Sequence, residues 1–548
     1  MSSLAGDDAT VVARLRTATV PRTESGDPLP ARFALELQPH QDPAAVAIMV
    51  ERALADLRVR VTSLSALDPE MLILDVLDRA LAAERPAACF AAGYALAGQF
   101  DLISAEPDLP TAFFPEHGTA RAGAPTGGAL AGFPPGCYVD PQPALEPTPA
   151  WALDRMHVPA AWTYSELSGR PSRGKDVIVA QPDTGIAAHV ELVGVAFVPG
   201  FDVIDDDNDP TDPLTGPGNP GHGTGTASVL VSLDSYVVTG SAPQAGLMPI
   251  RTIESVVRVR QVTVARAIDW AIQEGAHVVT MSLGGIPASA LHRAIRRAVE
   301  ADLVVLAAAG NCVRLVVWPA RYDECIAVAA TNAADEPWPG TCRGAPVDIS
   351  APGQNVYRAV VPPSGPSGAD TVGQGQGTSF AVALTAGVAA MWVAHHGRAN
   401  VVAAAHARGE TVQAMFRRLL QATARRPTPW DAGAMGPGIV DARALLEASF
   451  DVGLGRLGAD LQTNARAIAA SSVASLVTEA VGAGAVPDDT LDWHQFGPEL
   501  ATALLRQQLP GPPTEVPHAE QVSEPLTRNI RNPQLRGSLG LRNGRRRG

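Results

Sequence analysis

The chain has 548 residues, of which 46% are hydrophobic and only 18% are charged, and its formal net charge is −14. This length allows about three or four domains with a large buried core, and the negative charge argues against general nucleic-acid binding. The five cysteines are too few for a disulfide scaffold, and no apolar stretch reaches the roughly 18 residues that a membrane-spanning helix needs.

The beginning of the chain carries no visible export signal. Residues 1–10 have neither a basic segment nor the apolar run that a secretory signal requires. We predict a flexible segment over residues 1–30. The missing signal favours the cytoplasm, while secretion by another route remains an alternative.

Residues 31–109 have the pattern of a small α+β domain. Alternating and amphipathic periodicities predict the order β-α-β-β-α-β, which is that of a ferredoxin-like fold. The predicted strands are 31–38, 59–64, 71–76 and 101–105, and the predicted helices are 43–56 and 77–98. A linker rich in proline and glycine follows at 110–150.

Strands and helices then alternate from 151 to 449. The predicted strands are 177–181, 278–283, 303–308 and 326–330, and the predicted helices between or after them are 262–274, 289–300 and 380–393. Such alternation predicts a mostly parallel sheet covered by helices on both faces, in an α/β fold. In these sheets the chemistry lies at the carboxyl ends of the strands, and Asp183 and Asn311 both follow predicted strands.

The remainder of the chain is predicted to be an extension. Two helices, at 459–481 and 497–509, are expected within a helical segment 450–509. Residues 510–548 begin with prolines and end with arginines, so we predict a disordered tail. We interpret its arginines as a solvated terminus rather than as a nucleic-acid-binding arm.

Three short motifs carry the groups of a serine hydrolase. Ser379 opens the apolar run at the start of a predicted helix, and a serine hydroxyl needs a neighbouring base to act as a nucleophile. His222, which follows a loop rich in glycine and proline, would be that base. Asp183 would hold the imidazole in the useful tautomer. Each motif is weak evidence alone, and their combined order is what indicates acyl-bond hydrolysis.

The tetrahedral intermediate of such a reaction needs hydrogen-bond donors for its oxyanion. Asn311 lies after a predicted strand, between the second and third members of the set. Its side-chain amide and the backbone N–H of Ser379 are therefore the predicted donors.

Several segments of 151–449 together resemble the subtilisin-like serine proteases, the subtilases of family S8. The matching segments are 177–186, 221–224, 282–285, 309–311, 377–379 and 436–442. The resemblance implies a three-layer α/β sandwich and an endopeptidase that forms an acyl-enzyme through Asp183, His222 and Ser379. It also implies oxyanion binding by Asn311 and a substrate-binding edge made of Ser282, Leu283, Gly284, Ala309 and Gly310.

The sequence departs from the usual family pattern near two of these motifs. Gly225 stands where a second histidine is usual, and Ser228 stands where glycine is common. Residues 380–384 replace the usual small residues and proline after the serine. We expect these changes to alter the packing behind the site rather than the proton-transfer groups.

The N-terminal unit resembles the inhibitory propeptides of the same family. The resemblance implies a self-inhibited precursor, or zymogen, that cleavage within 110–150 would activate; an unrelated accessory domain is the alternative. The expected partners are a polypeptide substrate and this intramolecular domain, with no nucleic acid and no membrane.

Two metal and cysteine questions remain open from sequence. The loop before His222 is crowded with acidic side chains, and Asp205, Asp207 and Asp209 could provide oxygen ligands for a structural calcium ion. A simply solvated loop is the alternative, and no cofactor is required for the chemistry. We expect ordinary free thiols, with a Cys312–Cys325 bridge as the lesser alternative.

A second function competes with an ordinary endopeptidase. A specialised or weakly active subtilase could serve as a peptide-maturation or binding module, with 450–548 as its recognition part. An α/β-hydrolase esterase is disfavoured because Ser379 lacks a Gly-x-Ser-x-Gly elbow and the order of the three groups differs.

Overall fold

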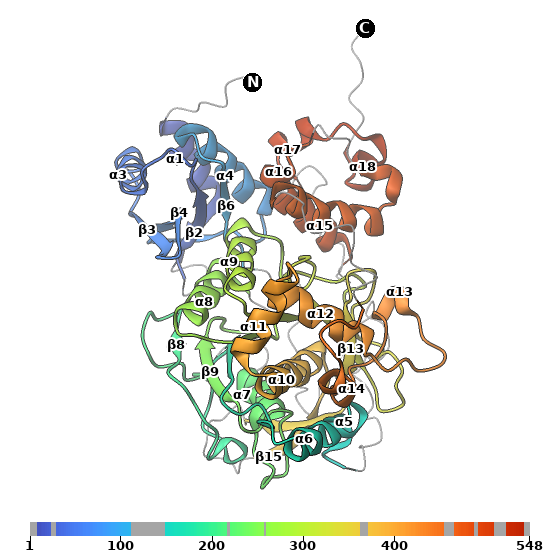
Figure 1. Ribbon diagram of the computed structural model, residues 1–548. Coiled ribbons are helices and arrows are strands. Elements are labelled where there is room, and N and C mark those ends of the chain that lie inside the picture. Colours follow the sequence, from blue (N-terminus) through green and yellow to red (C-terminus); the bar gives the residue numbers. More distant parts are fainter. Residues whose placement is uncertain are drawn as a thin grey trace, which may run out of the picture.

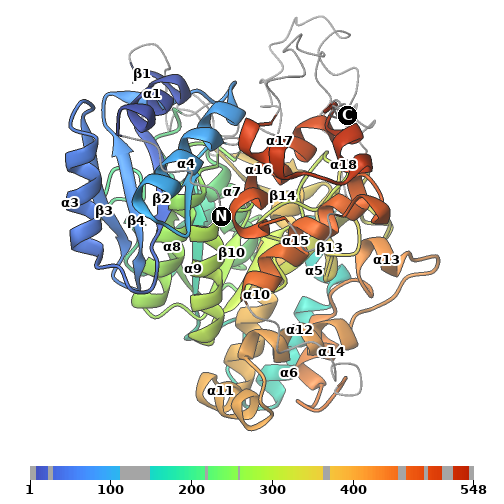
Figure 2. The same cartoon turned by 90° about the horizontal axis from the view of Figure 1, so that it is seen from above.

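The computed structural model describes residues 8–22, 29–110, 148–215, 220–256, 259–361, 371–453, 465–486, 491–508 and 522–541. Its helices and strands form three parts. The N-terminal and C-terminal parts lie side by side on the same end of a larger α/β domain (Figures 1 and 2). Most of the predicted linker 110–150 lies outside the described residues.

The N-terminal domain is built on a four-stranded antiparallel sheet of order β3-β4-β2-β6. Its strands are β2 (Ala31–Glu36), β3 (Val59–Ser65), β4 (Asp68–Val76) and β6 (Ser104–Pro107), and its two predicted helices are α3 (Pro43–Ala53) and α4 (Pro86–Phe100). The sheet and the helices share one core, because strand residues such as Phe33 and Leu74 belong to the same buried cluster as apolar residues of α3 and α4.

Two expectations for this domain are wrong in detail. Residues 8–21, predicted to be flexible, form helix α1 (Asp8–Ala18) and strand β1 (Thr19–Pro21), and Val11 and Leu15 of α1 are fully buried. The second helix does not begin at residue 77, because strand β5 (Arg79–Leu81) pairs with β1 there. The helix begins instead at Pro86, a residue that suits a first helical turn and disfavours helix in the residue before it.

The central domain contains a seven-stranded sheet of order β13-β12-β11-β10-β7-β9-β8, in which neighbouring strands are parallel. The strands are β7 (Ile178–Asp183), β8 (Phe201–Asp202), β9 (Gly246–Arg251), β10 (Val278–Met281), β11 (Val304–Ala308), β12 (Ile326–Thr331) and β13 (Ile349–Pro352). A two-stranded antiparallel ribbon, made of β14 (Val356–Val360) and β15 (Thr371–Gly375), follows β13 in the sequence.

Helices cover both faces of this sheet, which confirms the predicted three-layer α/β fold. Val279, Val305 and Ala307 belong to one apolar cluster with α8 (Gln261–Gln273) and α9 (Ser289–Glu300). Val278, Val304 and Leu306 belong to a second cluster with α7 (His222–Val231) and α10 (Thr378–His396). The alternation follows from the two-residue period of a strand. The other helices are α5 (Trp151–Arg155), α6 (Val158–Leu167), α11 (Arg398–Ala407), α12 (Val412–Ala422), α13 (Ala432–Met435) and α14 (Ala442–Glu447), with a short 3₁₀ turn η1 (Val190–Leu192).

Helix α10 is the apolar run that the sequence predicted after Ser379. Among the described helices, it alone is long and apolar enough to cross a membrane by length and composition, and its most apolar window is entirely buried inside the protein. A helix that is apolar on all sides and enclosed in this way is a central core helix.

The C-terminal extension consists of α15 (Ala465–Ala480), α16 (Trp493–Gln508), α17 (Glu524–Asn529) and α18 (Pro533–Ser538), with a 3₁₀ turn η3 (Ala483–Ala485). The first two helices were predicted. The prediction of disorder is wrong for residues 522–541, where Leu526, Leu535 and Leu539 are fully buried. Local caps explain why these short helices form: the Ser523 hydroxyl accepts a hydrogen bond from the first turn of α17, and Asn532 caps α18 in the same way.

Candidate functional site

The carboxylate of Asp183 lies at the carboxyl end of β7 and is 1% exposed. Its Oδ1 is 2.8 Å from Nδ1 of His222 and also accepts a hydrogen bond from the backbone N–H of Thr184 at 2.7 Å. The hydroxyl of Thr226 is 3.3 Å from Oδ2. The carboxylate is thus buried, hydrogen-bonded and directed at one ring nitrogen of the histidine, which leaves the other ring nitrogen for chemistry.

His222 is brought to this carboxylate by the first residues of α7. The residue before it, Gly221, has φ +74°, which a side chain would strain. The residue after it, Gly223, approaches the loop that follows β7 so closely that a Cβ would lie 2.2 Å from the carbonyl oxygen of Gly185. The His-Gly motif therefore has a local reason: glycine lets the helix begin against the strand end that carries Asp183.

Two residues that the sequence analysis did not identify support the pair from behind. Gln181 of β7 donates from Nε2 to the carbonyl oxygen of Gly223 at 2.9 Å and to the Thr226 hydroxyl at 2.7 Å. Thr226 in turn faces Asp183. In the sequence, only position pointed to them: Gln181 lies on the same strand as Asp183, and Thr226 lies on the same helix as His222.

Ser379 lies in the first turn of α10, as predicted, and its residue is 8% exposed. Its hydroxyl donates to the carbonyl oxygen of Ser282 over a long 3.4 Å. The Ser282 hydroxyl donates back to the carbonyl oxygen of Ser379 at 3.0 Å. The hydroxyl of Ser379 is therefore weakly hydrogen-bonded to the residue after β10, and not to the imidazole of His222. Rotation about the Cα–Cβ bond of Ser379 would turn the hydroxyl toward that imidazole.

The amide of Asn311 is oriented by the residue before the serine. Its Oδ1 accepts hydrogen bonds from the backbone N–H and the hydroxyl of Thr378, at 2.9 and 2.8 Å. Its Nδ2 consequently faces Gly377, where a Cβ would lie 3.2 Å from that nitrogen. The sequence analysis missed this role of Thr378, although the residue was part of the motif.

The predicted substrate-binding residues lie at the ends of adjacent strands. Ser282, Leu283 and Gly284 follow β10, and Ala309 and Gly310 follow β11. All five are buried in this structure. Gly310 donates its N–H to the Thr378 hydroxyl at 3.2 Å, so this segment and the start of α10 are directly joined. The structure brings the predicted edge and the predicted nucleophile to one edge of the sheet.

The two departures near His222 are accommodated by packing, as expected. Gly225 lies against the half-buried side chain of Arg358, and a Cβ there would be 3.1 Å from Nη1. Burial lowers the pKa of Arg358 to about 10. Ser228 donates to the carbonyl oxygen of Gly225 at 2.7 Å and accepts from the N–H of Ala359 at 2.9 Å, and so joins α7 to β14.

The acidic loop does not have the arrangement of a calcium site. Asp205 is 2.5 Å from Nη1 of Arg251, while Asp207 and Asp209 accept hydrogen bonds from backbone N–H groups two residues further on. Among the described residues no group of three acidic, histidine or cysteine side chains is placed to hold a metal. Arginine and the loop's own backbone therefore engage the carboxylates that were predicted to bind calcium.

The expectation of free thiols is confirmed at Cys89, Cys325 and Cys342 and is wrong at Cys312. Cys325 is a free and buried thiol, so a Cys312–Cys325 bridge is wrong. Cys312 is disulfide-bonded, so the expectation of a free thiol fails at that position. Cys89 and Cys342 are free, and burial raises the pKa of each to about 12, which makes them unreactive.

Comparisons with known proteins concern the same part of the chain. Residues 174–455 match the sequence model of the subtilase family. The chain is 34% identical to subtilisin BL of Lederbergia lenta over 247 residues, which are 44% of this chain and 82% of that protein. It is also 34% identical to thermitase of Thermoactinomyces vulgaris over 249 residues, which are 44% of this chain and 81% of that protein.

A solved structure is similar over a larger share of the chain. The structure of fervidolysin from Fervidobacterium pennivorans matches with a TM-score of 0.54 and 21% identity, covering 78% of this chain and 62% of that one. At this identity the likeness concerns the fold alone. The matched family segment 174–455 contains Asp183, His222 and Ser379.

Proposed function

Since this chain belongs to the subtilase family and is a subtilisin-like serine endopeptidase, we propose that it hydrolyses peptide bonds through Asp183, His222 and Ser379. The observation that carries this assignment is the 2.8 Å contact between the buried Asp183 carboxylate and Nδ1 of His222. This contact leaves Nε2 as the proton acceptor. Subtilases need no cofactor for their chemistry, and here a nucleophile, a base and an oxyanion donor all come from the chain.

The first half of the reaction forms an acyl-enzyme. The hydroxyl of Ser379 leaves the carbonyl of Ser282, and its oxygen attacks the scissile carbonyl carbon while Nε2 of His222 takes the proton. The 3.4 Å bond to Ser282 is long enough to be exchanged at little cost. Catalytic hydrogen bonds often tighten only when substrate is bound. The protonated His222 then gives its proton to the leaving amine.

Asn311 and the start of α10 stabilise the charge that develops on the substrate oxygen. Thr378 occupies Oδ1 of Asn311, so Nδ2 is the atom that can donate to the oxyanion. The backbone N–H of Ser379, at the positive end of α10, is the second donor. In the second half of the reaction, water activated by His222 attacks the acyl carbon, and the same donors stabilise the second oxyanion.

The substrate is a polypeptide, and we propose that it binds as an extended strand. Residues 282–284 and 309–310 follow neighbouring parallel strands and can offer main-chain hydrogen bonds to a peptide laid between them. Such bonds depend little on the substrate's side chains, so they favour binding of many sequences in one geometry.

We also propose that the enzyme is made as a self-inhibited precursor, with the N-terminal domain as its propeptide-like inhibitor. Strand β6 and the residues after it cap two helices of the central domain. Oδ1 of Asp108 accepts the N–H groups of Gln261 and Val262 at the start of α8, at 2.8 and 3.1 Å. Glu106 accepts the N–H of Ser289 at the start of α9, at 2.9 Å. Carboxylates at two helix starts are a favourable docking arrangement.

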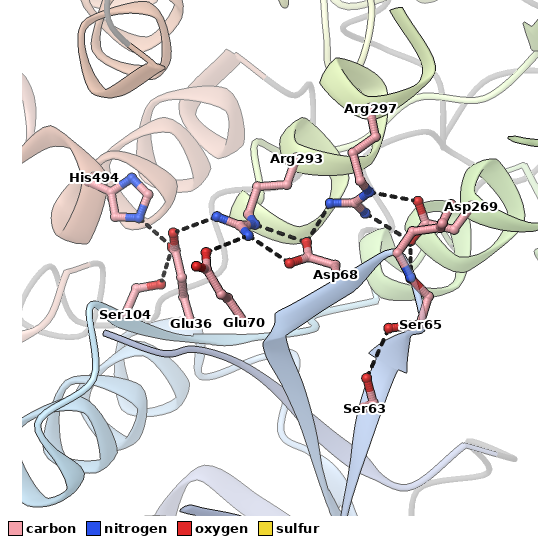
Figure 3. Close-up of polar contacts among 11 residues, drawn as sticks. Glu36, Ser63, Ser65, Asp68, Glu70, Ser104, Asp269, Arg293, Arg297 and His494 are labelled. Atoms are coloured by element: carbon pink, nitrogen blue, oxygen red, sulfur yellow. Dashed lines mark hydrogen bonds and ion pairs between the residues drawn. The ribbon is translucent and has the colours of Figure 1, made fainter. Parts of the chain in front are cut away.

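A chain of ion pairs supports the same docking (Figure 3). Asp68 of β4 is 1% exposed and accepts hydrogen bonds from Arg293 at 2.6 Å and Arg297 at 2.5 Å, both on α9. Arg297 also contacts Asp269 of α8 at 2.8 Å, and the hydroxyl of Ser65 on β3 donates to that carboxylate at 2.5 Å. The sheet of the N-terminal domain thus lies on α8 and α9 through buried, paired charges.

The proposal is tested by comparing purified wild type with Ser379→Ala. We expect the wild type to hydrolyse an unfolded protein and to shorten its own chain within 110–150, as seen by intact mass. We expect the variant to do neither and to remain at full length. Equal shortening of the pure variant would contradict self-processing, and equal hydrolysis by both would contradict the assigned nucleophile.

A further inference from the structure

The C-terminal extension contacts the N-terminal domain directly, although the two lie at opposite ends of the chain. Tyr94 of α4 donates its hydroxyl to Oε2 of Glu499 on α16 at 2.8 Å, and both groups are buried. Beside this bond the ring of Tyr94 meets the ring of Phe496 with centroids 5.0 Å apart. Nη2 of Arg506 donates to the carbonyl oxygen of Ala83 at 3.2 Å. Helices α16 and α17 both pack against α4.

Glu499 also organises the extension itself. Its carboxylate accepts the Ser523 hydroxyl at 2.8 Å and the Ser523 backbone N–H, and Ser523 is the cap of α17. One carboxylate therefore joins α4 of the N-terminal domain to two helices of the extension. Three donors on a buried carboxylate make its position specific.

A second junction involves all three parts of the molecule. Glu36 of β2 is 2.5 Å from Nε2 of His494 on α16 and 3.5 Å from Nη1 of Arg293 on α9, and it accepts the Ser104 hydroxyl at 3.2 Å (Figure 3). Glu36 is 5% exposed. The N-terminal domain therefore presents one buried carboxylate between a cation of the central domain and the imidazole of the extension.

The extension is itself anchored to the central domain. The guanidinium of Arg321, whose side chain is completely buried, is 2.5 Å from Glu479 and 3.0 Å from the hydroxyl of Ser475, both on α15. Apolar residues of α15, α16 and α18 belong to the same buried cluster as those of α8, α9 and the N-terminal sheet. The extension can thus restrain the N-terminal domain because it is held firmly on the other side.

The junction is bordered by a cavity of about 380 Å³ that residues of all three parts line, among them Glu36, Tyr322 and His494. The N-terminal domain and the extension are therefore not in continuous apolar contact beside Glu36. Polar contacts at the edge of the cavity connect Glu36 to the extension there.

We propose that helices α15–α18 are a clasp that keeps the N-terminal domain bound after the linker is cut, and so set the rate at which inhibition is relieved. This inference rests on the proposed role of the N-terminal domain as an inhibitor. The capped helices α8 and α9 hold one side of that domain, and the clasp holds α4 and Glu36 on the other. Cleavage of the linker alone then leaves a bound inhibitor, and activation requires the clasp to release it.

The test measures retention of the N-terminal domain in the full chain, without relying on its own activity. In a Ser379→Ala background, a recognition sequence for a site-specific protease is inserted within 111–136, before Cys137 in the chain. After cutting, the release of the N-terminal fragment is followed by size-exclusion chromatography after dilution. We expect Tyr94→Phe and His494→Leu each to speed release about tenfold, because each removes one hydrogen bond to a buried carboxylate.

Arg528→Ala is the matched control, because Arg528 is an exposed residue of the same extension whose one ion pair, among the residues that the structure describes, is with Glu524 of its own helix. Release from the control should equal that of the parent. Release that is unchanged in both Tyr94→Phe and His494→Leu would overturn the clasp. Phe496→Ala, if it folds, should speed release further, and an unchanged rate there would count equally against the clasp.

Failure of the clasp and failure of the proposed precursor are distinguishable. The retention experiment uses an inactive chain and an external protease, so it does not depend on self-processing. A wild type that never shortens itself, together with retention that depends on the clasp, would contradict only the precursor. A wild type that shortens itself, together with retention that ignores the clasp variants, would contradict only the clasp.

Discussion

Buried carboxylates are used in two different ways in this molecule. At the candidate catalytic site, Asp183 is 1% exposed and orients the imidazole of His222. At the contact between the N-terminal and central domains, Asp68 is equally buried and faces the guanidinium groups of Arg293 and Arg297. The carboxylates have similar surroundings, and the partner decides the consequence. An imidazole can exchange a proton near neutral pH, whereas a guanidinium cannot, so the first pair can catalyse and the second can only dock.

This difference predicts that replacing Asp183 mainly lowers activity, whereas replacing Asp68 mainly loosens the contact between domains. The largest expected effect is the loss of activity at the catalytic site. Asp183→Asn should lower kcat about 10⁴-fold, because an amide favours the wrong tautomer of His222. The N-terminal domain should stay docked. Steady-state peptide hydrolysis together with thermal unfolding checks both halves, and a kcat within tenfold of wild type would contradict the assigned role of Asp183.

The next effect concerns the oxyanion. Asn311→Ala should reduce kcat about 10²–10³-fold with a smaller change in KM, because the lost donor acts mainly in the transition state. Thr378→Val is the informative companion, since it removes the hydroxyl that orients Oδ1 while leaving the amide in place. Its kcat should lie between those of Asn311→Ala and wild type. A pure KM effect in Asn311→Ala would show that the amide binds substrate rather than the oxyanion.

Replacing Asp68 should instead weaken the contact between the N-terminal and central domains without lowering kcat. Asp68→Ala removes one buried partner from each of two arginines, which keep Asp269 and Glu36 as further partners, so we expect a loss of about 1–3 kcal/mol. We expect faster hydrogen exchange over β3, β4 and α9, with kcat of the matured enzyme unchanged. Glu70→Gln is the control, because Glu70 contacts Arg293 at 3.1 Å but its side chain is 47% exposed, and it should have little effect. Equal exchange in Asp68→Ala and Glu70→Gln would contradict the docking role.

Glu499 gives the contact with the extension a pH dependence. Burial raises the pKa of Glu499 from 4.5 to about 7, although the hydrogen bonds from Ser523 and Tyr94 oppose the rise. The folded protein therefore holds this proton up to a higher pH than the unfolded chain does. Its contribution is fully present below about 4.5 and is lost as the pH rises through about 7.

Retention of the N-terminal fragment should accordingly weaken between these two pH values. Glu499→Gln should remove that part of the pH dependence, because an amide does not titrate. Parallel retention curves for wild type and Glu499→Gln in the inactive background would show that this carboxyl is not the titrating group.

The smallest expected effect is at the acidic loop. Arg251 and Arg266 pair with Asp205 and Asp206, so the protein itself already balances part of the negative charge of this loop. The melting temperature of the inactive full chain should be the same with calcium and with a chelator. A rise in melting temperature with calcium that disappears on substituting Asp205 would restore the calcium site that the sequence suggested.

Much of the central domain could be predicted because its signals are local. The apolar run after Ser379 is an α-helix that opens with the motif, and α9 has the predicted bounds, Ser289–Glu300. The N-terminal sheet was also predicted, because its strands alternate. What failed were short elements that depend on distant partners. Strand β1 exists through β5, and α17 is stabilised by Glu499 through its cap Ser523.

The residues that support the Asp183–His222 pair also could not be predicted from the sequence. Gln181 and Thr226 act behind Asp183 only because β7 and α7 meet there. The acidic loop shows the reverse error: its composition suggested a cation, and Arg251, more than forty residues away in the chain, supplied the positive charge. Long-range pairing decides both cases, and no local pattern reports it.

The central claim is that one serine hydroxyl is activated by His222, and active-site labelling tests it most directly. Purified wild type, Ser379→Ala and Ser282→Ala are treated with a fluorophosphonate, and the modified peptide is identified by mass spectrometry. We expect one adduct, on Ser379, in wild type and in Ser282→Ala, and none in Ser379→Ala. An adduct on another serine, or labelling that persists in Ser379→Ala, would contradict the account.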